Sequence, residues 1–358
     1  MKVNASWAFA GNAVYAFCQW LVFALLLRSL RLADVGLFAY WIAVTGPIFV
    51  LANLRLRSLV ATGVSSPNGF ADYLAARLLT VAAAVCVSLA LGAVLAKDVG
   101  AFTILALVAG AKAFDAVADI CHGLFQRELD MRSAAIGLTT NGVLSVALVA
   151  VSLAVSPSLR AAAAAYAAAS LLALAGWDLR RTGKHVEAGE RSVMRREVLR
   201  AARSIIWRAR PLGLSSAIAS LQIHLPRYAI GAYLGPASLA VFTALAYIPT
   251  LSNLIANAIA QAALPLLARD LRTSHALYRQ HLRMLVGSGL ALGVLTVIAT
   301  AVLGRSIITL IYGAEIAHHH DLLTWLMTAA ALTYAFLPLG TASAARTRFG
   351  AQALISTA

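Results

Sequence analysis

Charged residues are scarce in this sequence. Asp, Glu, Lys and Arg make up 12% of its 358 residues, about half of their usual share in soluble domains. Hydrophobic residues make up 61%, and the mean hydropathy is +0.81. The strict alternation of polar and apolar residues that is typical of membrane β-barrels is absent. Because backbone groups in lipid are otherwise satisfied only within helices, we predict an all-α, polytopic integral membrane protein.

Cysteine is scarce too, and the pattern of the three cysteines excludes a disulfide framework. Cys18, Cys86 and Cys121 lie in or at the edge of apolar spans, and no CxxC motif is present. A thiolate metal site is not expected either. We interpret each cysteine as a small buried hydrophobic residue.

Signatures of catalysis are missing as well. The sequence has no GxSxG, HExxH or Walker A motif, and its predicted outside connections are short. His318 to His320 precede Asp321, but one contiguous tripeptide rarely provides metal-binding geometry. We therefore predict no enzyme activity, no metal site and no cofactor.

Apolar runs long enough to cross a bilayer recur along the chain. We predict ten transmembrane helices, at 5–27, 35–54, 78–96, 99–120, 133–155, 161–177, 211–234, 238–262, 284–303 and 322–340. Lys and Arg concentrate on one side of these spans, which the positive-inside rule assigns to the cytosol together with both termini. The other side holds only Arg28, Arg31, Lys97, Arg160 and Arg305. The net charge of +15 thus reflects membrane topology, and no nucleic-acid partner is predicted.

The longest polar segment, 178–210, divides the chain. We predict an N-terminal six-helix lobe at 1–177, a basic cytosolic linker at 178–210, a C-terminal lobe of four helices at 211–340 and a cytosolic tail at 341–358. Residues 191–210 form either a basic helix on the anionic leaflet or a solvated linker. A faint repeat, LRLADVGLF (30–38) and LGPASLAVF (234–242), favours paired halves. Since equivalent halves would hold six helices each, we expect the chain to be truncated at its C-terminus.

One apolar span carries charge in the stretch KAFDAVADICH. Lys112, Asp115, Asp119 and His122 recur at intervals that place them along one helical stripe. Charges at bilayer depth are costly, so they need a partner or a function. One interpretation is a Lys112–Asp115 pair that holds the helix to its neighbours. The other is a water-filled cavity in which Lys112 meets an anionic substrate and Asp115 binds a proton or cation, with Asp119, nearer the surface, as a second ion-coupling candidate.

A further charge lies in LQIHLPRYAIG, in the middle of the seventh predicted span. Arg227 has no carboxylate within one helical turn in the sequence, and its planar guanidinium suits phosphate oxygens or a water-filled cavity.

Arg55 and Arg57 end the second span, where snorkelling to the cytosolic surface is the alternative to a role in binding. Four prolines are expected to interrupt spans: Pro47, Pro226, Pro249 and Pro338.

Four stretches together resemble one family. They are LADVGLFAYWIAVTGPIFVLANLRLRSLVATG (32–63), AKAFDAVADICHGLFQRELDMR (111–132), LPRYAIGAYLGPASLAVFTALAYI (225–248) and LIYGAEIA (310–317). Their order and spacing are similar to those of the O-antigen and polysaccharide flippases of the multidrug/oligosaccharidyl-lipid/polysaccharide exporter superfamily. The resemblance implies a MATE-like fold of two six-helix lobes around a central cavity, of which this sequence holds six helices and four.

The resemblance also implies a function. Such proteins move a lipid-linked oligosaccharide pyrophosphate, such as a lipopolysaccharide repeat unit, across the bacterial inner membrane by alternating access. A cationic cavity would then be lined by Arg227, Lys112 and Arg57, with the polyprenyl pyrophosphate carrier, membrane lipid and polysaccharide assembly proteins as partners. The alternatives are a truncated remnant that does not transport, a small-molecule exporter of the same superfamily, and a membrane-embedded polysaccharide polymerase or acyltransferase.

Overall fold

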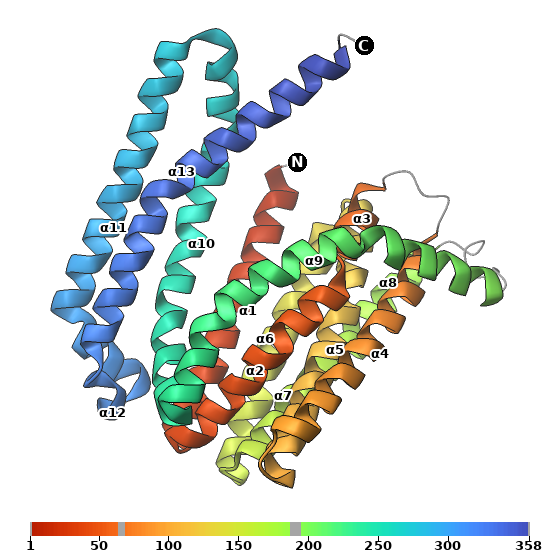
Figure 1. The fold of residues 1–358 in the computed structure, drawn as a ribbon, viewed down its shortest axis with the longest axis vertical. Helices are drawn as coiled ribbons and strands as arrows, with labels where there is room; N and C mark the ends of the chain where they lie inside the picture. The colour runs from red at the N-terminus through yellow and green to blue at the C-terminus, as the bar shows by residue number, and fades with distance from the viewer. Residues whose placement is uncertain (1, 64–68, 187–194, 357–358) are drawn as a thin grey trace. The chain divides into compact units, whose positions relative to one another are not determined.

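The computed structural model of the chain describes residues 2–63, 69–186 and 195–356 (Figure 1). These ranges consist of helices and short connections and hold no strand. The chain divides into two compact units, residues 1–240 and 241–358, and each is described here by itself. The prediction of an all-α membrane protein is confirmed, because eight stretches of the described chain are long and apolar enough to cross a membrane.

The first unit is built on helices α1 to α9. Their bounds are α1 (Lys2–Ser29), α2 (Leu32–Asn53), α3 (Leu56–Thr62), α4 (Phe70–Leu95), α5 (Val99–Arg127), α6 (Met131–Val155), α7 (Leu159–Ala173), the π-helical turn η1 (Leu174–Asp178), α8 (Leu179–His185) and α9 (Arg195–Tyr233). Asp98, Asp130 and Ser158 each accept a hydrogen bond from the first turn of α5, α6 and α7. These polar residues therefore set where three of the apolar spans begin.

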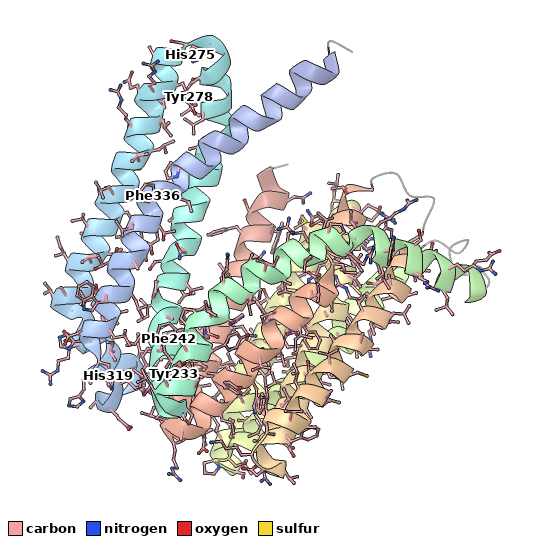
Figure 2. All side chains as sticks on the ribbon, in the orientation of Figure 1. Tyr233, Phe242, His275, Tyr278, His319 and Phe336 are labelled. Atoms are coloured by element: carbon pink, nitrogen blue, oxygen red, sulfur yellow. The ribbon has the colours of Figure 1, made fainter. Side chains whose placement is uncertain are left out.

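The second unit contains most of α10 (Gly235–Thr273), followed by α11 (His275–Tyr312), α12 (Ala314–Ala317) and α13 (His320–Ser356). Helices α11 and α13 pack side by side along much of their length (Figure 1). His275 and Tyr278 lie at one end of this unit and His319 at the other (Figure 2). The hydroxyl of Tyr312 donates a 3.0 Å hydrogen bond to the carbonyl of Ala244, which ties the end of α11 to α10.

Each of the ten predicted spans overlaps a helix, and 161–177 overlaps both α7 and η1, but the limits of the spans and of the helices differ. The eight stretches of sufficient length and hydropathy do not include α9 or α13, which hold the predicted spans 211–234 and 322–340. In α9, Gln222, His224 and Arg227 reduce the hydropathy of the span. The predicted linker 178–210 is helical from Asp178 to His185 and again from Arg195, while 187–194 lie outside the described residues.

Two expectations about single residue types were wrong. Helices α2, α9, α10 and α13 continue through Pro47, Pro226, Pro249 and Pro338, so these prolines do not interrupt the spans. Neighbouring helices can satisfy the backbone groups that a proline frees. Cys18 and Cys121 are buried as predicted, whereas Cys86 is exposed on α4, so this cysteine is not a core residue.

The sequence repeat brings its two copies into contact. Gly36, in the first copy, lies against the backbone of Pro236, in the second. A Cβ atom on Gly36 would collide with the Pro236 carbonyl group, so only glycine allows the starts of α2 and α10 to approach this closely.

The break between α2 and α3 places Arg57, one of the three residues that the sequence predicts to bind substrate. Leu54 and Arg55 adopt left-handed backbone conformations, with φ angles of 48° and 52°. Such angles are uncommon outside glycine and cost free energy, so the surrounding packing must stabilise them. Leu54 and Leu56 are buried in one hydrophobic cluster with Phe125 of α5. This anchored break ends the second span and presents Arg57 to α5.

Candidate functional site

A group of cationic side chains from α5 and α9 lies within the first unit, where α9 packs against α2 and α4. Lys112 comes from α5, and His224 and Arg227 come from successive turns of α9. Nη1 of Arg227 lies 3.4 Å from Nδ1 of His224 and 3.3 Å from the carbonyl oxygen of Ile223. The charges of Lys112 and Arg227 both act on the His224 imidazole. Two of the three predicted substrate-binding residues thus lie near enough to His224 for their charges to act on it, from helices far apart in the sequence.

Helix α2 packs against α9 and holds His224 and Arg227 in place. The hydroxyl of Tyr228 donates a 2.6 Å hydrogen bond to the carbonyl of Ala43. Gly46 leaves the space that the His224 ring occupies, because a Cβ atom there would lie 2.6 Å from Nε2. Tyr228 and Gly46 therefore fix the rotation of α9 against α2, and with it the positions of His224 and Arg227. The sequence alone did not reveal His224 as a member of the site.

Asp115 has a hydrogen-bond partner from another helix. Its Oδ1 accepts a 2.8 Å bond from the amide of Asn141 on α6, and the Asn141 oxygen accepts a 3.2 Å bond from the hydroxyl of Ser145. Asn141 and Ser145 are buried. The charge of Lys112 also acts on Asp115. Asp115 is therefore held in a polar chain that begins beside the cationic cluster and runs into α6.

Asp119 bridges two arginines. Its Oδ1 lies 3.3 Å from Nη1 of Arg57, and its Oδ2 lies 3.0 Å from Nη2 of Arg77. Arg77 is fully buried in α4 and also donates a hydrogen bond to the side chain of Asn53. Arg57 is thus engaged by Asp119, roughly 10 Å along α5 from Lys112. The sequence reading assigned Arg77 to a cytosolic loop, because the predicted span began one residue after it.

His122 also finds its partner outside the stripe. Its Nε2 lies 3.0 Å from Oδ1 of Asp178, and both side chains are almost fully buried. Asp178 ends the π-helical turn η1, and such turns are frequent at functional positions. Gly137 of α6 makes room for the pair, since a Cβ there would lie 2.9 Å from Nε2 of His122. The sequence reading placed Asp178 in the linker and missed this pair.

Asp130 forms a third ionic group, outside the spans. Its Oδ2 lies 2.9 Å from Nη2 of Arg181 and 3.3 Å from Nε2 of His185. Its carboxylate also accepts bonds from the backbone and hydroxyl of Ser133, which cap α6. Burial alone would raise the pKa of Asp130, but these hydrogen bonds from Ser133 and Arg181 outweigh it and lower the pKa to about 2.

The remaining candidates form no recognisable metal centre. His318 Nδ1 lies 2.9 Å from the carbonyl of Ala314, and His320 pairs with Asp321 at 3.2 Å. Within the described ranges, no three His, Cys, Asp or Glu side chains lie close enough together to hold a metal ion.

Comparison with known proteins identifies the family of this helical membrane protein. Residues 1–270 match the family of polysaccharide biosynthesis proteins, and the chain belongs to that family. The chain is 25% identical to the capsular polysaccharide biosynthesis protein CapF of Staphylococcus aureus over 326 residues. The aligned region covers 90% of this chain and 80% of CapF.

Solved structures define the fold more closely. The fold matches an inward-facing multidrug resistance MATE transporter of the MOP superfamily with a TM-score of 0.65 at 13% identity, over 94% of this chain and 86% of that one. An outward-facing MATE transporter of the same superfamily gives a TM-score of 0.61 at 15% identity, over 96% and 80%. A MOP superfamily transporter from Pyrococcus furiosus, described by the reverse polarity of its binding pocket, gives 0.54 at 14% identity, over 96% and 83%. The predicted MATE-like fold and the resemblance to a family of polysaccharide biosynthesis proteins are thus confirmed.

Proposed function

We propose that this protein flips a lipid-linked oligosaccharide pyrophosphate across the bacterial inner membrane by alternating access. The observation that carries the proposal is the cluster of Lys112 and Arg227 around His224 on α5 and α9. Membership in the polysaccharide biosynthesis family supports a saccharide-linked substrate. The same fold occurs in transporters solved facing inward and facing outward, which supports alternating access.

The chemistry of the cluster favours an anionic substrate. Cationic side chains inside an apolar bundle are costly and by default mark a site of function. The guanidinium fork of Arg227 can donate two parallel hydrogen bonds to phosphate oxygens, and the Lys112 ammonium adds a compact positive charge. A pyrophosphate offers oxygens to both groups at once. The cluster therefore serves to attract and orient the substrate, without a covalent step.

Arg57 and the two aspartates take different parts in this proposal. Asp115 remains the ion-coupling candidate, because its carboxylate lies beside Lys112 and is held by Asn141. A proton or cation that binds Asp115 would change the local charge next to the substrate cations. Asp119 is held between Arg57 and Arg77, so we assign Asp119 and Arg57 to structural support. Both termini are proposed to face the cytosol, following the distribution of Lys and Arg.

The test is complementation of a bacterial strain that lacks its own polysaccharide flippase. The wild-type chain should restore surface polysaccharide, and Lys112→Gln and Arg227→Gln should abolish it at equal membrane levels. Arg208→Gln, an exposed arginine on the same helix α9, is the matched control and should complement normally.

Two outcomes would contradict the proposal. Normal surface polysaccharide with both variants would remove the cluster from the mechanism. Absence of complementation by the wild type, together with raised resistance of the host to toxic small molecules, would favour the small-molecule exporter instead.

A further inference from the structure

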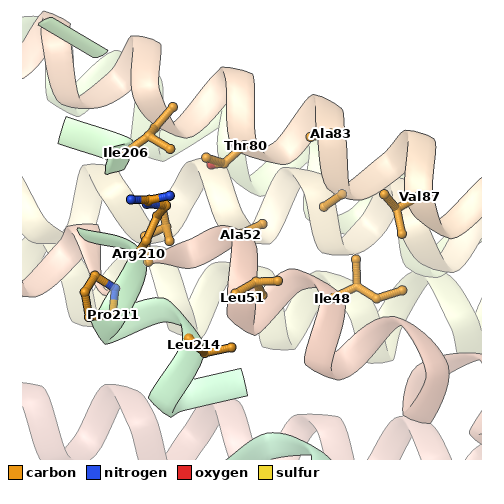
Figure 3. Close-up of a pocket in the computed structure, with 12 residues that line it drawn as sticks. Ile48, Leu51, Ala52, Thr80, Ala83, Val87, Ile206, Arg210, Pro211 and Leu214 are labelled. Atoms are coloured by element: carbon orange, nitrogen blue, oxygen red, sulfur yellow. The ribbon is translucent and has the colours of Figure 1, made fainter. Parts of the chain in front are cut away.

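A groove with apolar walls lies on the first unit between α2, α4 and α9 (Figure 3). Its volume is about 710 Å³, within the range of small-molecule sites. The lining includes two polar side chains, Thr80 and Arg210. The Thr80 hydroxyl already donates to the carbonyl of Arg77. Arg210 is therefore the single charged group that the groove offers to an occupant.

Close packing on one side and small residues on the other create the groove. Gly213 lets α9 approach α2, because a Cβ atom there would lie 3.0 Å from the carbonyl oxygen of Leu51. Across the groove, Ala83 and Ala84 of α4 leave space that larger side chains would fill. Small residues on α4 and α9 therefore form the groove where these helices meet α2.

The walls of the groove are open to the surroundings of the unit. The exposed fractions are 43% for Leu51, 49% for Val87 and 57% for Leu214. Water in such an apolar groove would find few hydrogen-bond partners, so a hydrocarbon chain is the better occupant. From Thr80 to Val87 the groove follows α4 for roughly 10 Å, which suits the part of a lipid chain next to its headgroup.

Arg210 defines where the headgroup would lie. Its guanidinium carbon stacks 2.9 Å from the ring centre of Trp207, and its Nε lies 3.2 Å from the Trp207 carbonyl oxygen. The contacts of the Arg210 guanidinium in the described part of the chain are with Trp207, and none is with a carboxylate. Arg203 lies seven residues earlier on the same helical stripe and is exposed as well. This end of the groove is therefore cationic, with an interfacial tryptophan of the kind that marks headgroup depth.

We propose that the groove binds one acyl chain of an anionic phospholipid of the cytosolic leaflet, with the lipid phosphate on Arg210. One guanidinium matches one phosphate diester. A polyprenyl pyrophosphate carries more charge and is better served by the paired cations Lys112 and Arg227. The site is separate from the proposed transport cluster, and lipid binding can be measured without transport.

The experiment is native mass spectrometry of the full chain, purified in mild detergent and mixed with phosphatidylglycerol or phosphatidylcholine. We expect one phosphatidylglycerol to stay bound and phosphatidylcholine to be lost. Arg210→Gln removes one charge-assisted contact and should weaken retention of phosphatidylglycerol roughly tenfold. Arg210→Lys, which keeps the charge but loses the fork, should give an intermediate loss. Arg208→Gln, about 200° around α9 from Arg210, should have no effect.

A second pair of variants tests the apolar part. Ala83→Trp fills the groove and should abolish retention, whereas Ala82→Trp, also exposed on α4 but outside the groove lining, should not. Equal retention of both phospholipids, full retention by Arg210→Gln, or displacement of phosphatidylglycerol by polyprenyl pyrophosphate at equal concentration would each overturn the proposal.

Discussion

Removal of the Asp119 carboxylate tests whether this residue supports the fold. In the structure it is the ion-pair partner of Arg77, which is fully buried, and of Arg57, whose side chain is 29% exposed. Asp119→Asn would leave the Arg77 guanidinium buried with Asn53 as its remaining side-chain partner. The same substitution costs Arg57 little, because water reaches its guanidinium.

The expected magnitudes follow from burial. Breaking a buried ion pair by removing one partner costs about 3–5 kcal/mol. Asp119 itself is 30% exposed, so water offsets part of this penalty and we expect about 3 kcal/mol, the lower end of that range. Arg57→Gln removes a partly exposed pair and should cost about 1 kcal/mol or less.

The assay is thermal unfolding of the purified variants in detergent. Asp119→Asn should lower the melting temperature clearly more than Arg57→Gln does. The double variant Asp119→Asn with Arg77→Met should regain stability, because no charge is left buried. Equal effects of the two single variants, or no recovery in the double variant, would refute the reasoning.

Three more predictions concern other packed or ionic positions. Gly36→Ala should cost about 1–3 kcal/mol through collision with the Pro236 backbone, while Gly110→Ala, with open space around it, should not destabilise; equal melting temperatures would contradict this. Asp178→Ala should cost about 1–3 kcal/mol because His122 loses its buried partner, and an unchanged unfolding midpoint would exclude such a role. The pKa of Asp130 falls from about 3.9 in the unfolded chain to about 2 in the folded one. The stability advantage of wild type over Asp130→Asn should therefore be full above pH 4 and vanish as the pH falls to 2; an advantage independent of pH would argue against the ion pair.

The helices of this protein were predictable because the bilayer leaves few alternatives. Long apolar runs predicted helices at all ten positions, since lipid requires each backbone group to be bonded within a helix, and eight stretches of the described chain are long and apolar enough to cross a membrane. Their ends were less predictable. Arg77 lies inside α4, whereas the predicted span began after it. The helix that begins with α7 continues through the π-helical turn η1, which places Asp178 inside the first unit. Both residues are polar, and a hydropathy criterion excludes such residues from a span even when a partner on another helix allows their burial.

The sequence predicted the cationic residues of the site, but it did not predict which residues the charged side chains of α5 would bond to. Lys112 and Arg227 stood out because isolated charges in apolar spans are rare. The stripe from Lys112 to His122 suggested partners within one helix, whereas Asp115, Asp119 and His122 bond to Asn141, Arg77 and Asp178 of other helices. A sequence pattern gives the face of a helix but does not tell which helix that face meets.

The most direct test of the proposed function is transport by the purified chain. The protein would be reconstituted into liposomes that carry a fluorescent polyprenyl pyrophosphate oligosaccharide, and an added glycosidase would report which leaflet holds the sugar. We predict that wild type and Arg208→Gln expose substrate from the inner leaflet to the enzyme over time, and that Lys112→Gln and Arg227→Gln do so no faster than protein-free liposomes. Equal rates for wild type and protein-free liposomes, or unchanged rates in both cluster variants, would contradict the account.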